Sequence, residues 1–252
     1  MPTRKILISA VALLAAASSG CIKMEHSLHL REDGSGRYAV TYTTPGQTIT
    51  RLKAMRELRR DLARAAGRSA EKAAAKGLAE TFLQGTEAEI RDFVERFQPH
   101  GVEIKAISVD IRDAQRVFKL ETTFDDIGKL AQTPFFEAYG FSLTKNRDGD
   151  YVLYRAAPID RNAPTLDLSN PEDAKLVAPF LQGFQTKVRV TVPGRILKSN
   201  APATSLHTSI WSFDFDQNPE SYADLLSKGL GLVFDGTGST LPQIRREAEK
   251  RR

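Results

Sequence analysis

The chain has 252 residues, of which 41% are hydrophobic and 27% charged, and its formal net charge is +5 at pH 7. This composition is typical of a folded globular protein and excludes a chain that is disordered throughout, while the length suffices for one large domain or two small ones. The single cysteine, Cys21, excludes an intramolecular disulfide, so stability must come from burial of a core.

The first segment of the chain has the pattern of an export signal. Two basic residues, Arg4 and Lys5, precede an apolar run over residues 6–17, and small residues follow. About a dozen apolar residues are too few to cross a hydrocarbon core about 30 Å thick as a helix, so the pattern predicts a cleaved signal rather than a membrane span. Two cuts fit the residues: an ordinary secretory cut near Ser19, or a cut directly before Cys21.

The end of this segment, Ser-Ser-Gly-Cys at 18–21, resembles the lipobox of bacterial lipoproteins at Gly20 and Cys21. The resemblance implies that residues 1–20 are a lipoprotein signal peptide and that Cys21 is the site of lipid attachment, with palmitate or a similar acyl chain on the mature protein. Acylation would also account for an exported protein with one cysteine, which would otherwise carry a free thiol. Two or more acyl chains anchor a protein stably.

Lipoprotein sorting gives a further expectation about location. No aspartate follows Cys21, and Ile22 stands in that position. By resemblance to sorting in bacteria with two membranes, this favours the outer membrane, with the domain facing the periplasm or the exterior.

Residues 24–42 predict a β-hairpin. Apolar and polar residues alternate over 24–30 and again over 38–42, which is the period of a half-buried strand. The Asp-Gly-Ser-Gly sequence at 33–36 favours a tight reversal between the two strands.

Two helices are predicted next. From Thr48 the apolar spacing changes to steps of three and four, which predicts a long amphipathic helix that ends near Gly85. Thr86 and Glu89 have the spacing of a capping box, so a second, shorter helix is expected to begin there and to end before Pro99.

The rest of the chain predicts mostly strands. Two further strand pairs are expected at 102–124, with a bulge near 106–107, and at 141–154, with short helical turns between them. A loop at 156–170 and a helix at 170–183 precede the remaining elements. These are strands at 184–192, 211–215 and 230–234, a short helix at 219–228 and a charged helical tail.

Hairpins separated by helices predict an α+β fold, with an antiparallel sheet built from hairpins and with the long amphipathic helix and the shorter helices packed on one face. We expect three segments: a signal peptide at 1–20, a single α+β envelope domain at 21–240 and a charged helical tail at 241–252. A boundary near 156–170 is the alternative, but the last strands are expected to complete the first sheet.

Three short motifs resemble the LppM-type lipoprotein family. They are a strand that ends in Pro193-Gly194, the turn Ser199-Asn200-Ala201, and a strand that carries Trp211. That family also begins with an acylated cysteine, a strand and a glycine-containing hairpin. The resemblance implies an envelope-facing α+β domain that contacts lipids or glycolipids, and it carries over no catalytic residue. The matching residues near the start are Cys21, Leu28, Leu30, Asp33 and Gly34.

The sequence shows no spacing typical of a metal or cofactor site, and neither is expected. His26 and His29 are three apart on a predicted strand and therefore point to opposite faces. Together with His100 and His207, they are expected to be ordinary surface or edge residues. Asp214 and Asp216 share one face of a predicted strand and could form a carboxylate pair, but they fit the solvated side of an amphipathic strand better.

The strongest functional signal is positive charge in the long helix. Residues 51–76 hold nine bases and three acids, a local net charge of +6. Like charges four residues apart cost a few tenths of a kcal/mol each, whereas a base near an anionic membrane surface contributes about 1 kcal/mol. A contact with an anion or membrane is therefore one interpretation, and a solvated helix face is the other. The expected contact residues are Arg56, Arg59, Arg60 and Arg64.

These expectations combine into one function. The sequence predicts a membrane-anchored envelope lipoprotein that is not an enzyme and acts as a binding or structural module on a lipid, an envelope polymer or a protein partner. The export signal disfavours nucleic acid as the partner of the basic helix. The alternative is an envelope hydrolase that uses Asp214, Asp216 or the histidines, which requires these side chains to converge in one cleft.

Overall fold

A computed structural model describes residues 22–65, 78–133, 141–155, 182–218 and 229–244. The predicted signal peptide at 1–20, the lipid attachment site Cys21 and the predicted loop at 156–170 lie outside the described residues. So do the helix at 219–228, nearly all of the helix at 170–183 and most of the tail at 241–252.

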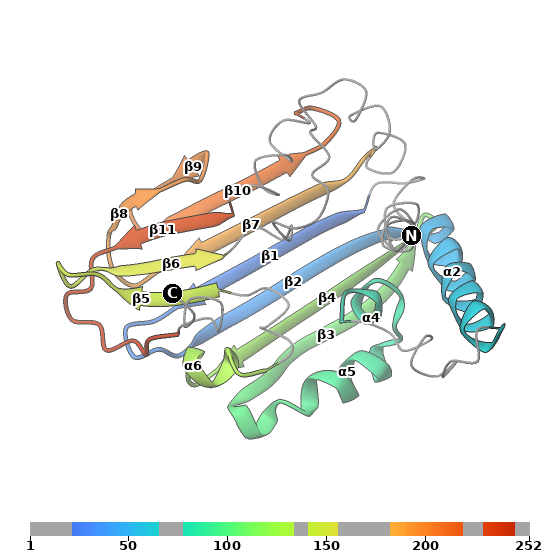
Figure 1. Ribbon diagram of the computed structural model, residues 1–252, viewed down its shortest axis with the longest axis horizontal. Coiled ribbons are helices and arrows are strands. Elements are labelled where there is room, and N and C mark those ends of the chain that lie inside the picture. The colour runs from blue at the N-terminus through green and yellow to red at the C-terminus, as the bar shows by residue number, and fades with distance from the viewer. Residues whose placement is uncertain (1–21, 66–77, 134–140, 156–181, 219–228, 245–252) are drawn as a thin grey trace.

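The larger of two sheets has seven strands in the order β3-β4-β2-β1-β7-β10-β9 (Figure 1). The predicted hairpin is confirmed, because β1 and β2 pair antiparallel from Lys23 opposite Thr43 onward. The pairing of β1 with β7 is parallel, which the prediction of an antiparallel sheet did not include. The strands are β1 (Lys23–Leu30), β2 (Gly36–Pro45), β3 (Val102–Arg112), β4 (Gln115–Phe124), β7 (Gln185–Thr191), β9 (Ala203–Thr204) and β10 (Thr208–Asp214).

A second sheet has four strands in the order β5-β6-β11-β8 and lies over the β1, β7 and β10 side of the larger sheet (Figure 1). The prediction that the last strands complete the first sheet is therefore only half right. The strands β7, β9 and β10 do so, whereas β8 and β11 join the second sheet. Its strands are β5 (Phe141–Lys145), β6 (Tyr151–Arg155), β8 (Ile196–Ser199) and β11 (Leu230–Phe234).

Alternation along each strand gives the larger sheet one buried and one polar face. Leu28, Val40 and Leu120 are each 2% exposed and belong to one hydrophobic cluster, to which Leu153 and Phe234 of the second sheet also belong. The residues between them on the larger sheet are polar or small and reach solvent. The second sheet and two short helices thus cover a single face of the larger sheet.

Aromatic rings fill the core beneath the short helices. Phe82 stacks on Phe118 with 5.2 Å between ring centroids, and Tyr42 lies 5.9 Å and 6.0 Å from these two rings. Aromatic pairs at such distances contribute about 0.5–1.5 kcal/mol beyond the area they bury. This cluster joins the helix that carries Phe82 to strands β2 and β4.

The helices only partly follow the prediction. The helix α5 begins with the predicted capping box, in which Thr86 and Glu89 each bond to the backbone of the other, and it packs on β3, while α4 packs on β2. Gly101, with φ of 74°, takes the left-handed conformation at which the chain turns into β3. The helices are α2 (Gly46–Ala65), α4 (Leu78–Gln84), α5 (Glu87–Glu95), the 3-10 helix η1 (Gln98–His100) and α6 (Ile127–Leu130).

The structure does not support the prediction of a long amphipathic helix packed on the sheet. The described part of this helix ends at Ala65 and stands beside the end of the larger sheet rather than on its face (Figure 1). Leu58, a member of the predicted apolar stripe, is 58% exposed. The helix contacts β2, which it follows in the chain, and α4.

A buried arginine fastens α4 to the sheet. The Arg116 guanidinium on β4 donates to the carbonyl oxygens of Phe82, at 2.7 Å, and of Gly85, and its centre lies 5.6 Å from the Phe118 ring. These carbonyls belong to the last turn of α4 and the residue after it, where no helical donor is available. Burial lowers the pKa of Arg116 to about 10, so the side chain keeps its charge at neutral pH.

The chain passes from the second sheet to the larger one at Asn200, between β8 and β9. The Asn200 side-chain oxygen accepts from Trp211 Nε1 of the larger sheet and from the Gly231 amide of the second sheet, each at 2.9 Å. Its amide nitrogen donates to the Gly229 carbonyl at 3.1 Å. The Ser-Asn-Ala turn and Trp211 thus connect the two sheets by hydrogen bonds.

Candidate functional site

The basic helix starts at the end of the sheet at which the described chain begins. Lys23 pairs with Thr43, β2 ends two residues later, and α2 follows at Gly46. Ile22, the first described residue, is buried, and its carbonyl accepts from the Gln185 amide at 2.9 Å. The residue that follows Cys21 is therefore held at the same end of the sheet as the start of α2 (Figure 1).

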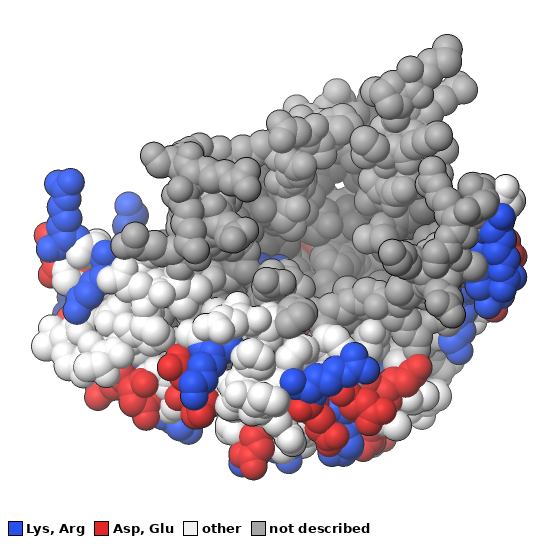
Figure 2. Space-filling model, turned by 60° about the horizontal axis from the view of Figure 1, so that its bottom comes forward, with Lys and Arg blue, Asp and Glu red and all other residues white. Residues whose placement is uncertain are grey.

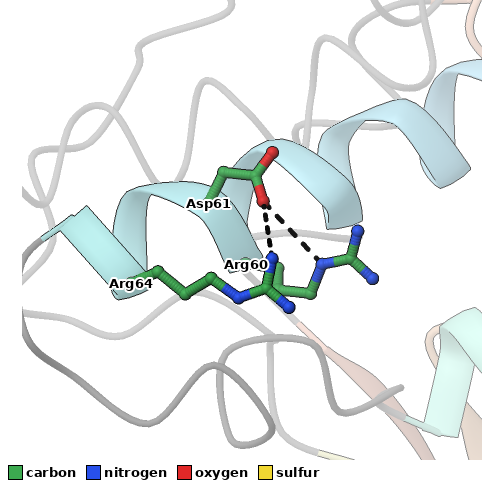
Figure 3. Close-up of polar contacts among 3 residues, drawn as sticks. All are labelled: Arg60, Asp61 and Arg64. Carbon is green, nitrogen blue, oxygen red and sulfur yellow. Dashed lines mark hydrogen bonds and ion pairs between the residues drawn. The ribbon is translucent and has the colours of Figure 1, made fainter.

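One carboxylate lies between two of the predicted contact residues. The distances from Asp61 Oδ1 are 3.9 Å to Arg60 Nε and 3.5 Å to Arg64 Nη1 (Figure 3). The Arg60 and Arg64 side chains are 42% and 61% exposed, and ion pairs at such exposure contribute only about 0–1 kcal/mol. The side chains of Arg56 and Arg59 lie outside the described ones.

The charges of α2 are unbalanced. The helix contains six bases and two acids, a net charge of +4. In Figure 2 its blue side chains form a group at the right edge, whereas acids and bases alternate where α5 and β3 face the viewer. On α5, Arg91 is paired with Glu87 at 3.0 Å and acids outnumber bases, so the excess of positive charge does not extend to this helix. The excess of bases on α2 leaves that helix able to bind an anion.

A cavity of about 690 Å³ opens at the same end of the larger sheet. Met24, Trp211 and Phe213 provide its apolar lining, and Gln185 and Asp214 lie at its polar side, joined by a hydrogen bond of 2.8 Å from Gln185 Nε2 to Asp214 Oδ2. A cavity with mostly apolar walls and a few polar groups is the usual form of a small-molecule site. No local sequence pattern indicates this cavity, because its walls come from β1, β7 and β10 together.

The two aspartates considered for a carboxylate pair bind backbone amides instead. Asp214 Oδ1 accepts from the amides of Asp216 and Gln217, at 3.1 Å and 3.2 Å, and the Asp216 carboxylate accepts from the Gly183 amide at 2.9 Å. Asp214 is the last residue of β10, and Asp216 follows the end of the strand. The Asp214 carboxylate therefore shapes the turn after β10, and the Asp216 carboxylate joins that turn to Gly183, two residues before β7.

The prediction of a surface position is wrong for His26, which is buried in the core. Its Nδ1 lies 2.8 Å from the Tyr38 hydroxyl and its Nε2 3.4 Å from the Tyr42 hydroxyl. Burial lowers the pKa of His26 to about 3, with a smaller contribution from the positive charge of Arg155. The signal for this burial was present in the sequence, since His26 alternates in phase with Leu28 and Leu30.

The other histidines lie at the surface or close to it. His29 is exposed on the face opposite to His26, as predicted, and His100 ends the 3-10 helix. His207 Nδ1 donates to the Gly194 carbonyl at 3.0 Å. Although His29 and His207 are far apart in the sequence, they line one hollow of about 620 Å³ at the end of β1 and β7.

The described residues contain no group of three or more histidine, cysteine, aspartate or glutamate side chains that could hold a metal ion. Within the same ranges, no helix is both long enough and apolar enough to cross a membrane.

Three exposed arginines were missed by the sequence analysis: Arg31, Arg37 and Arg189. Arg37 lies on β2 and Arg189 on β7, whereas Arg31 directly follows β1. The three line one groove on the polar face of the larger sheet. The only signal in the sequence was their position among the outward residues of β-strands. Their proximity depends on the parallel pairing of β1 with β7, which no local pattern indicates.

The comparisons with known proteins found little. No protein-family model matches the sequence, and no curated protein matches it. Among solved structures, the chain is similar to the NMR structure of the folded domain of LppM from Mycobacterium tuberculosis, with a TM-score of 0.38 and 12% sequence identity over 88% of this chain and 96% of that chain. The likeness is weak and the identity low, so it says nothing about function.

Proposed function

We propose that this chain is a membrane-anchored module of the cell envelope that binds an anionic surface and catalyses no reaction. The observation that carries the proposal is the position of α2, a helix with a net charge of +4 that begins at the end of the sheet where β1 follows Cys21. Acylated Cys21 would hold this end at the membrane, which is the outer one in a cell with two membranes. The basic helix would then lie near the lipid phosphates.

The energetics support two cooperating contacts. A single acyl chain binds a bilayer only marginally, whereas two chains, or one chain with a basic patch, give stable attachment. Each lysine or arginine near an anionic membrane contributes about 1 kcal/mol. The exposed Leu58 on α2 adds an apolar side chain of the kind that enters the membrane interface.

The cavity beside the start of β1 supports a binding role over a purely structural one. Its apolar lining by Met24, Trp211 and Phe213 suits the apolar part of a ligand, and Gln185 and Asp214 offer hydrogen-bonding groups. The absence of catalysis is part of the proposal and is supported by Asp214 and Asp216, whose carboxylates accept bonds from backbone amides.

The first prediction concerns the anchor. The wild-type protein is expected to incorporate palmitate, to have an intact mass that corresponds to acylation at Cys21 and to sediment with membranes. The Cys21→Ala variant is expected to be unlabelled and soluble. A wild-type protein that is cut near Ser19 and carries no acyl chain would contradict the anchor, and the lone cysteine would then need another explanation.

The second prediction concerns α2. Reversal of Arg60 and Arg64 to glutamate is expected to weaken binding of the purified chain to phosphatidylglycerol vesicles at least tenfold, because two attractive charges become repulsive. The effect is expected to shrink at high salt, which screens exposed charges. Vesicle sedimentation across a salt series measures both.

A matched control reverses two exposed bases outside α2, Arg147 and Lys198. The net charge changes equally, so a general effect of charge would weaken vesicle binding in both double variants. If the control loses as much affinity as the Arg60 and Arg64 variant, α2 is not the contact.

A further inference from the structure

The polar face of the larger sheet is lined by exposed charged and polar side chains. Glu25 and His29 on β1, Arg37 on β2, Lys119 on β4 and Arg189 on β7 are all exposed on this face. The short helices α4 and α5 and the second sheet cover the opposite face (Figure 1). Any ligand of the polar face would therefore bind the strands directly.

Strand pairing brings three arginines of this face together. Arg37 stands opposite His29 in the antiparallel pair of β1 and β2, and Arg189 stands opposite Ser27 in the parallel pair of β1 and β7. Arg31 follows His29 by two residues, just beyond the end of β1. The three side chains line a groove of about 430 Å³, together with Ser27, His29 and Thr191.

The positive charge in this groove is only partly neutralised. Arg37 forms an ion pair with Glu121. Arg31 donates to the Ser35 hydroxyl at 3.1 Å, and its positive charge helps to lower the pKa of the Asp33 carboxyl. Arg189 has no acidic partner among the residues that the structure describes. Of the three guanidinium groups, that of Arg189 thus keeps an unbalanced charge.

The groove also offers neutral hydrogen-bonding groups. The Thr191 hydroxyl lies 3.0 Å from the Thr208 hydroxyl, and Ser27 lies between β2 and β7 on the central strand. Guanidinium groups bind phosphate through paired N–H donors, which makes arginine the preferred residue for phosphate recognition. Donors from three adjacent strands suit a compact anion that carries more than one charge.

We propose that this groove binds a phosphate group of a soluble or polymeric ligand. The groove lies at the other end of β1 from α2, since His29 is six residues beyond Lys23 and each strand residue advances the chain about 3.3 Å, or about 20 Å in all. The choice of a soluble source rests on the proposed anchoring at Cys21, because that anchor holds the opposite end of the sheet at the membrane. The groove itself does not depend on it.

The test is calorimetric titration of the purified full-length chain with inorganic tripolyphosphate at constant ionic strength. The Arg37→Gln/Arg189→Gln variant is expected to bind at least tenfold more weakly than wild type. The Arg147→Gln/Lys198→Gln control, with the same loss of charge at exposed sites, is expected to bind within twofold of wild type. Equal weakening in both variants, or no weakening in the first, would overturn the proposal.

Two further measurements make the test independent of the variants and of the anchor. In wild-type protein, tripolyphosphate is expected to shift the amide NMR signals of Ser27, His29 and Thr191, and shifts confined to other regions would overturn the groove. Citrate is expected to bind at least tenfold more weakly, so equal binding would overturn the choice of phosphate.

Phosphatidylglycerol vesicles distinguish the source of the phosphate. The Arg37→Gln/Arg189→Gln variant is expected to bind such vesicles as wild type does. Loss of vesicle binding with unchanged tripolyphosphate binding would mean that the groove recognises lipid headgroups, and would overturn the proposal of a soluble ligand. A failed Cys21 or α2 experiment leaves the tripolyphosphate result unaffected, so the two proposals fail separately.

Discussion

Lowering the pH from 7 to 5 is expected to lower the free energy of unfolding by about 2 kcal/mol through His26 alone. The folded chain holds this imidazole neutral between Tyr38 and Tyr42, with a pKa of about 3, whereas the unfolded chain protonates it near 6.5. Between these two values the unfolded state binds more protons, so stability falls as the pH falls. The contribution is fully present above about pH 6.5 and is lost progressively down to about pH 3.

Urea unfolding at pH 7, 6 and 5 measures this slope, and His26→Gln is the matched variant because glutamine keeps hydrogen-bonding groups but does not titrate. The variant is expected to lose most of the slope while it remains less stable than wild type at pH 7. Two carboxyl groups with lowered pKa values, Asp33 and Asp235, are stabilised as anions by bonds from Ser35 and Thr237 and titrate below this range. Equal slopes in both proteins would show that His26 is not the cause.

Replacement of Arg116 by methionine is expected to lower the free energy of unfolding by about 3 kcal/mol. Arg116 is 5% exposed, and its guanidinium is the side-chain donor to the Phe82 and Gly85 carbonyl oxygens. Methionine fills much of the same volume but leaves these oxygens without that donor, and a buried polar group without a partner costs about 1–3 kcal/mol. The variant also no longer buries the arginine charge, which is itself unfavourable. The expected loss of stability is therefore smaller than the sum for two unpaired carbonyl oxygens.

The control for Arg116 is Arg112→Met, on the same β3–β4 hairpin. The Arg112 side chain is 76% exposed, and substitutions at such positions usually change stability by less than about 0.5 kcal/mol. Denaturant unfolding of both variants is the measurement. Hydrogen exchange adds a local readout, since the amides of α4 are expected to lose protection first in Arg116→Met. Similar stability in the two variants would contradict the role given to Arg116.

Local features of the fold could be predicted from the sequence. The hairpin of β1 and β2, the capping box of Thr86 and Glu89, and the irregular pairing in β3 were expected and are confirmed. The register of β3 shifts between Ile104 and Ala106, close to the predicted bulge. Each of these features depends on residues within a few positions of one another, so their side-chain chemistry is sufficient.

Features that join distant segments could not be predicted in the same way. The parallel pairing of β1 with β7 links residues about 160 positions apart, as at Lys23 and Gln185. The residue pattern of either strand does not indicate which other strand pairs with it. The assignment of β8 and β9 to different sheets is made by Asn200, whose bonds to Trp211 and Gly231 form only when both sheets are assembled.

The candidate sites also differ in how far the sequence predicts them. The excess of bases in α2 could be predicted from the sequence, because its residues are contiguous. The position of the helix could not be predicted, since Leu58 of the expected apolar stripe is exposed. Arg37 and Arg189 carry no signal as a pair, because β1 separates their strands in space while some 150 residues separate them along the chain.

The sequence by itself therefore determined most of the strands, the capping box of α5 and the charge of α2, because these depend on short-range side-chain and backbone preferences. The tertiary structure decided that two sheets share one core and that three arginines line one groove. The physical reason is that desolvation and the proximity of like charges depend on which distant segments pack together. Alternation along a strand distinguishes its two faces, but only packing decides what covers each of them.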